Sequence, residues 1–244
     1  MSNEHDESRR KFLSRPVKVL PAVALASTGL GAVTTVTAQT ATATAAGSYM
    51  PTYFQEEEWR FIQAAVDVLI PEDDAGPGAI IAGVPEFIDR QMETPYGHGR
   101  LWYMQGPFHP EMMRSKPDLG YQLNMNPRDI YRSGISELNA WCNRTHHQVF
   151  ADLDKDTQVQ VIKDLEGKKI AFSDDAVLAS TFWEQLLSNT KEGFFADPIY
   201  GGNKNMVGWK MVGFPGARAD FMDWIDHPNE PYPYGPVSIS GEKA

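Results

Sequence analysis

The sequence contains a single cysteine, Cys142, among its 244 residues. One thiol cannot build an internal disulfide framework, a cysteine-ligated zinc site or an iron–sulfur cluster, and no Cys-x-x-Cys-His sequence is present to attach a c-type haem. Basic residues are also few, since 22 lysines and arginines face 32 aspartates and glutamates, for a formal net charge of −10. Nucleic acids and anionic lipids bind basic surfaces, so this charge disfavours both as main partners.

Motifs that bind nucleotides are absent as well. The chain has no Gly-x-Gly-x-x-Gly for a flavin or nicotinamide dinucleotide and no glycine-rich phosphate loop ending in Lys-Ser/Thr. The glycines at 76–78 and 201–202 lack a strand–turn–helix setting, and we interpret both as turns. The sequence therefore predicts no catalytic, cofactor-binding or metal-binding residue in this chain.

The first 38 residues have the three parts of an export signal. A basic region is followed by an uncharged stretch over 19–38, which ends in the small-x-small sequence Val36-Thr37-Ala38. The basic region resembles a twin-arginine signal through Arg9, Arg10, Phe12 and Leu13. Pro21, two glycines and five serines or threonines make the uncharged stretch a weak membrane anchor, so cleavage is favoured over retention. We expect a periplasmic protein.

Residues 39–50 are predicted to be a flexible tether, because alanine and threonine dominate them. Five basic and three acidic side chains precede residue 39, so the remainder carries a net charge of −12. The folded domain is predicted to span 51–244.

Hydrophobic periodicity in this domain predicts an all-α fold. Apolar residues recur at helical spacing from Trp59 to Leu69, and Pro71 ends that helix. Thr52 and Gln55 have the spacing of a capping box before it. No segment alternates long enough to predict a strand.

Four further helices are expected. Asn126-Pro127 provides a capping side chain and then proline at the first helical position. One has the expected inward residues Ile81, Val84, Phe87, Ile88 and Met92, and the helix that starts at Asn126-Pro127 has Tyr131, Ile135, Leu138, Cys142, Thr145 and Val149. A shorter helix covers 157–165. The last is capped by Ser173, runs to about Asn189 and has Leu178, Phe182 and Leu186 inward.

Two segments lack any period. Residues 96–126 are rich in glycine, proline, methionine and aromatic residues, and an irregular segment of this length suggests a functional or partner surface. Residues 193–216 combine paired glycines with aromatic residues and are predicted to be a non-periodic loop.

The histidines are weak candidates for chemistry. His146 and His147 are adjacent, so on a helix they point about 100° apart and cannot chelate a metal together. His98, His109 and His227 are expected in loops, without a paired nucleophile.

Cys142 has two interpretations. It falls on the apolar stripe of its helix, which favours a buried, inert thiol. A lone cysteine in an exported protein is also typical of a disulfide between subunits, so a bridge to a partner stays open.

The sequence resembles the small subunit (subunit 3, gamma) of gluconate 2-dehydrogenase over roughly residues 50–227. The resemblance is carried by the twin-arginine leader, the Trp59–Pro71 helix, and above all Asp197-Pro-Ile-Tyr-Gly-Gly-Asn203, Gly208-Trp209 and Phe214-Pro215-Gly216. In that family the large subunit carries FAD and oxidises the substrate, and a multihaem cytochrome c subunit passes electrons to quinone.

The resemblance implies a non-catalytic role. The small subunit would hold no cofactor, would supply the signal read by the twin-arginine translocase for a large subunit that lacks one, and would stay bound to it. It would meet the membrane only through the complex. Related complexes oxidise glucose, fructose, sorbitol or 2-ketogluconate, so the resemblance does not define the substrate.

The glycine-tryptophan loop is the expected contact with the large subunit. Aromatic anchors are favoured in such interfaces, and the predicted contact residues are Tyr200, Gly201, Gly202, Asn203, Trp209 and Phe214. The alternative is a loop that packs against its own domain. Two alternative functions also stay open: a hydrolase using histidines and carboxylates of 96–126, and a module that binds sugar through its aromatic loops.

Overall fold

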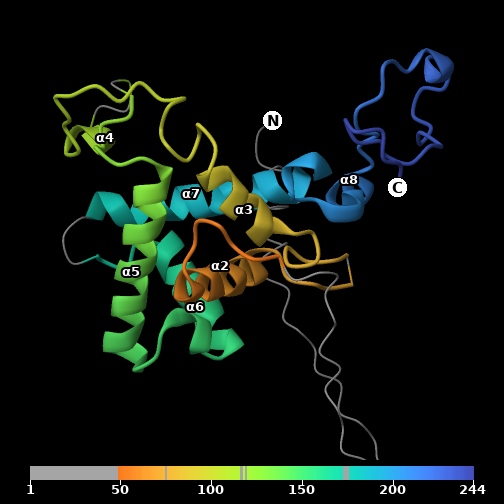
Figure 1. The fold of residues 1–244 in the computed structure, drawn as a ribbon. Coiled ribbons are helices and arrows are strands. Elements are labelled where there is room, and N and C mark those ends of the chain that lie inside the picture. The colour runs from red at the N-terminus through yellow and green to blue at the C-terminus, as the bar shows by residue number, and fades with distance from the viewer. Residues whose placement is uncertain (1–48, 75, 116–117, 119, 173–175) are drawn as a thin grey trace, which may run out of the picture. The chain divides into compact units, whose positions relative to one another are not determined.

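Helices are the regular elements of the computed structural model, which describes residues 49–244 except 75, 116–117, 119 and 173–175 (Figure 1). Within these described residues the only β-type pairing consists of isolated bridges, which confirms the all-α expectation. No helix in this part of the chain is long and apolar enough to cross a bilayer. The leader residues Arg9, Arg10, Phe12 and Leu13 and the predicted cap Ser173 lie outside the described residues.

The first helix of the described residues, α2 (Glu56–Leu69), ends before Pro71 as predicted, but the predicted capping box was wrong. Gln55 caps the helix and pairs with Glu58. Thr52 instead donates from its backbone N and its Oγ1 to Asp89 Oδ2, at 2.7 and 3.0 Å. Thr52 is therefore engaged in a tertiary contact and does not cap this helix.

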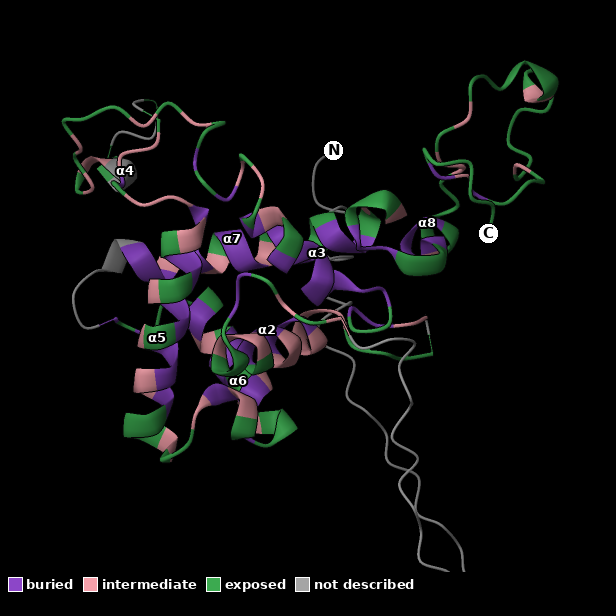
Figure 2. Ribbon diagram, viewed as in Figure 1, coloured by how far each residue is buried: buried purple, intermediate pink, exposed green. Residues whose placement is uncertain are grey.

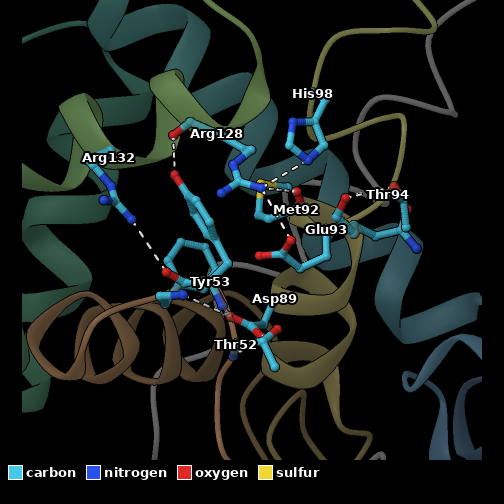
Figure 3. A network of polar contacts seen from close by, with 11 residues as sticks. Thr52, Tyr53, Asp89, Met92, Glu93, Thr94, His98, Arg128 and Arg132 are labelled. Atoms are coloured by element: carbon cyan, nitrogen blue, oxygen red, sulfur yellow. Dashed lines mark hydrogen bonds and ion pairs between the residues drawn. The ribbon is translucent and has the colours of Figure 1, made fainter.

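Asp89 lies on α3 (Val84–Met92) and is fully buried. Its two carboxylate oxygens accept five hydrogen bonds, from Tyr49 Oη, from Thr52 N and Oγ1, and from the backbone N of Tyr53 and Phe54, at 2.7–3.1 Å. The carboxylate thus holds 49–54 against α3 (Figure 3). Tyr49 belongs to the folded domain, although we expected the tether to extend to residue 50.

Tyr53 joins this segment to α5 (Pro127–His146). The guanidinium groups of Arg128 and Arg132 lie 4.4 and 4.9 Å from the centre of its ring, and its hydroxyl donates to Arg128 O at 2.7 Å (Figure 3). Arg128 also contacts Glu93 and His98, and Arg132 pairs with Glu58. Both arginines are therefore used within the fold.

The start of α5 is as predicted, because Asn126 caps it through Asp129 N and proline follows. Its end is earlier than the apolar pattern suggested. His147 adopts a left-handed conformation and closes the helix, so Thr145 is exposed and Val149 lies beyond it.

Helix α7 (Ala176–Phe195) is central to the core, because it packs against α2, α3, α5 and α6 (Lys155–Glu166). Leu178, Phe182 and Leu186 are buried as predicted. Gly134 lets α5 approach, because a Cβ there would lie 2.3 Å from the Phe182 ring. Buried residues line the facing sides of these helices in Figure 2. The helix α7 continues six residues past the predicted end at Asn189.

Residues 96–126 are largely irregular as expected and contain the short helix α4 (Met112–Ser115). The prediction for 193–216 was partly wrong. This segment contains the end of α7, the 3₁₀ turns η3 (Pro198–Tyr200) and η4 (Lys204–Met206), and α8 (Val207–Val212). Shorter elements complete the described chain: η2 (Phe150–Asp152) and η5 (Met222–Trp224).

Candidate partner interface

The segment after α7 is held together by Asp197. One carboxylate oxygen accepts from Ile199 N at 3.1 Å and so caps η3. The other accepts from Ile239 N at 2.7 Å, 42 residues further along the chain. Asp197 therefore joins the end of α7 to the C-terminal segment.

Asn203 performs a similar role inside the segment. It is fully buried, its Nδ2 donates to Ala196 O at 2.9 Å, and its Oδ1 accepts from Gly208 N at 2.8 Å. Gly202 allows this packing, because a Cβ there would lie 2.2 Å from Gly193 O. These bonds place α8 against the end of α7.

Trp209 completes the attachment of α8. Its side chain is 6% exposed and its Nε1 donates to Phe195 O at 2.7 Å. Gly208 beside it permits close contact, because a Cβ there would lie 2.1 Å from Phe194 O. Trp209 is thus a packing residue of this domain.

The structure divides the six residues predicted to contact a partner. Gly201, Gly202, Asn203 and Trp209 are buried within the chain, as the self-packing alternative required. Tyr200 and Phe214 are 50% and 47% exposed. Of the six predicted contact residues, only these two have exposed side chains, and their contact with a partner stays a prediction.

Exposed apolar side chains are concentrated around this segment. Eleven of the sixteen large apolar side chains that are exposed in the described chain lie between 195 and 239: Phe195, Ile199, Tyr200, Met211, Val212, Phe214, Phe221, Met222, Ile225, Tyr234 and Ile239. We call them the exposed apolar set. Figure 2 shows the chain after α8 as mostly exposed. This density of exposed apolar side chains makes 195–239 the candidate binding segment of the described chain.

The histidines considered for chemistry each contact different neighbours. His109 and His227 contact Glu111 and Glu230 at 3.1 and 3.2 Å, and the His227 ring stacks on Trp224. His146 packs against Trp141. Among the described residues, no group of three or more His, Cys, Asp or Glu side chains is placed to hold a metal ion.

Cys142 belongs to α5, and its side chain is fully buried in the core. Burial raises the pKa of its thiol to about 12. A thiol that is buried and protonated is a poor partner for an intersubunit disulfide, so the structure favours the inert thiol over the bridge.

Comparison with known families identifies the chain. A family described as gluconate 2-dehydrogenase subunit 3 matches residues 56–216. The chain belongs to the gluconate 2-dehydrogenase subunit 3 family. No curated protein and no solved structure matches it.

In this subunit 3 protein the match includes the whole Asp197–Gly216 scaffold and stops where the C-terminal segment begins. Our sequence reasoning missed Asp89. The available signal was one acidic residue among the apolar positions of α3, beside Ile88 and before Met92.

Proposed function

We propose that this chain is the non-catalytic small subunit of a periplasmic, FAD-dependent sugar or sugar-acid dehydrogenase, required for export and assembly of the flavin subunit. The exposed apolar set carries the proposal, because a member of this family with such a surface is suited to binding a larger subunit. FAD would reside in the large subunit and haem c in a cytochrome subunit, since this sequence lacks the motifs for either.

The proposed mechanism couples binding to export. The chain binds the folded, flavin-loaded large subunit in the cytoplasm, and its twin-arginine leader carries both across the membrane. The small subunit then remains bound and stabilises the native large subunit, because a ligand that binds only the native state shifts folding toward it. Membrane association follows from the other subunits.

Co-purification tests this proposal. The tagged full chain is expressed with the genes adjacent to its own, and the periplasmic fraction is purified. We expect a larger, yellow flavoprotein to accompany it, and to disappear from the periplasm when Arg9 and Arg10 are changed to Lys. A colourless, solitary chain, with the flavoprotein still exported without it, would refute the proposal.

A sugar-binding module is the second candidate. An open hollow of about 460 Å³ is lined by aromatic and polar residues: Phe87, Gln91, Glu192, Phe195, Ala196, Asp197 and Tyr200. Both carboxylates in it are already used within the chain, Asp197 by Ile199 and Ile239, and Glu192 by Ser188 and Asn189. This use favours the first candidate. Calorimetric titration of the purified chain with gluconate and glucose distinguishes the two, since only the module would release heat of binding.

A further inference from the structure

We call residues 217–236 the C-terminal loop. This loop lies beyond the residues matched by the family, and the residues at its two ends are bonded to each other. Ala217 N donates to Val237 O at 2.7 Å, Val237 N donates to Pro215 O at 3.2 Å, and Gly216 forms a β-bridge with Val237. Ile239 just after the loop is bonded to Asp197. The base of the loop is therefore joined to the scaffold that carries α8.

Aromatic rings of the loop contact one another. The ring of Tyr232 lies 5.3 Å from Phe221, 6.0 Å from Trp224 and 5.5 Å from Tyr234. The Arg218 guanidinium lies over Tyr232 and Tyr234, and it donates to Gly235 O at 2.8 Å. These contacts give the loop a preformed shape, which lowers the entropy lost when a partner binds.

An apolar hollow opens on the loop. Its volume is about 510 Å³ and it is lined by Pro215, Phe221, Met222, Trp224, Ile225 and Tyr232. Met222 and Ile225 at this hollow are 69% and 68% exposed. Sugar sites need several converging polar groups. This lining is almost entirely apolar, so it fits apolar side chains of a protein.

The charges of the C-terminal loop further restrict which kind of partner fits the hollow. The loop carries four exposed carboxylates, Asp220, Asp223, Asp226 and Glu230. Of its basic side chains, Arg218 faces the loop's own tyrosine rings and His227 lies 3.2 Å from Glu230. A second copy of this chain would bring the same acidic rim against itself, which costs free energy in a symmetric interface. A partner with lysine or arginine beside its apolar side chains is complementary.

We propose that the C-terminal loop is a docking element that binds an apolar segment flanked by lysine or arginine on the large subunit. This inference rests on the proposed function and identifies the surface that performs it. The loop lies outside residues 56–216, the region matched by the family.

The test uses the tagged full chain co-expressed with its adjacent genes, and flavin absorbance measures the retained large subunit. The test variant is Met222→Ser/Ile225→Ser, and the matched control is Met50→Ser/Ile80→Ser, whose side chains are 79% and 42% exposed and lie outside both 96–126 and the exposed apolar set. We expect the test variant to weaken retention about tenfold or more and the control to leave it unchanged. Asp220→Asn/Asp223→Asn/Asp226→Asn, which leaves the apolar residues in place, should weaken retention most at low salt.

Each other outcome has a definite meaning. Full retention by Met222→Ser/Ile225→Ser overturns the docking inference and leaves the proposed function intact. Absence of flavoprotein with the unaltered chain refutes the proposed function itself. If light scattering shows that the unaltered chain is a dimer and Met222→Ser/Ile225→Ser a monomer, a second copy occupies the hollow and the inference is wrong.

Discussion

At the scale of single residues, Asp89 has the largest structural role found here. Its buried carboxylate accepts bonds from four residues that lie 35 to 40 positions earlier in the chain. Hydrogen bonds to a charged acceptor contribute about 1.5–3 kcal/mol each, so a buried charge with so many donors is strongly coupled to its partners.

Asp89→Asn should therefore destabilise the domain by about 2–4 kcal/mol, because the asparagine NH₂ group would face N–H and O–H groups that donate to the carboxylate. Chemical denaturation measures this difference. The control Asp220→Asn changes an exposed carboxylate and should stay within about 0.5 kcal/mol. Equal stability of the two variants would show that 49–54 is held by something other than Asp89.

Tyr49 makes this contact sensitive to alkali. Burial and the hydrogen bond to Asp89 raise the pKa of Tyr49 from its ordinary 10 to about 12. The phenol is neutral when protonated, so a raised pKa in the folded state stabilises the fold fully below pH 10, and this contribution is lost between pH 10 and about 12. Stability measured against pH should fall across that window, and Tyr49→Phe should make the fall shallower. An identical slope in both proteins would contradict this assignment.

Cys142 should be unreactive in the folded chain. With a pKa near 12, about one thiol in ten thousand is ionised at pH 8. Ellman's reagent should detect no thiol in the native protein and one after denaturation. Reducing and non-reducing gels of the complex should show the same bands, and a band that shifts would establish the intersubunit bridge.

At the scale of elements, α8 depends on contacts outside itself. A helix of six residues is too short to persist alone. Asn203, through Gly208 N, and Trp209, through Phe195 O, connect it to the end of α7. The position of the exposed side chains on α8 follows from these buried bonds.

Trp209→Ala should therefore act mainly on stability, and Phe214→Ala mainly on retention of the large subunit. The first removes a buried ring and its hydrogen bond, and should lower the free energy of unfolding by about 3–5 kcal/mol. The second removes a half-exposed ring 5.2 Å from Trp209, and should cost about 1 kcal/mol while weakening retention of the large subunit. Thermal unfolding and co-purification of both variants measure the two quantities. A stable Trp209→Ala protein that fails to assemble would return Trp209 to the interface.

At the scale of the whole molecule, the described chain combines a well-packed helical core with a concentrated apolar surface at 195–239. Such a surface should bind the fluorescent dye ANS when the subunit is isolated, and bound dye should be released when the complex forms. Met222→Ser/Ile225→Ser should lower the ANS signal of the isolated subunit, and Met50→Ser/Ile80→Ser provides the matched comparison. An ANS signal that is the same in the isolated subunit and in the complex would argue against a covered surface.

Local signals in the sequence were enough to predict much of the fold. Pro71 ends α2, Asn126 and Pro127 start α5, and the apolar stripes of α2, α5 and α7 match the buried faces. These signals succeed because proline, capping side chains and helical periodicity act within a few residues. The family resemblance was likewise carried above all by local motifs between Asp197 and Gly216.

Long-range contacts decided the rest. Thr52 has the spacing of a cap, yet Asp89 binds it from 37 residues away. Trp209 and Asn203 have the composition of an interface, yet both are buried, because their hydrogen-bond partners at the end of α7 lie close only in the folded chain. The sequence by itself determined the longer helices and the family, through interactions between near neighbours. Only the tertiary structure decided which aromatic side chains are buried and which are exposed, because burial depends on residues that are distant in the chain.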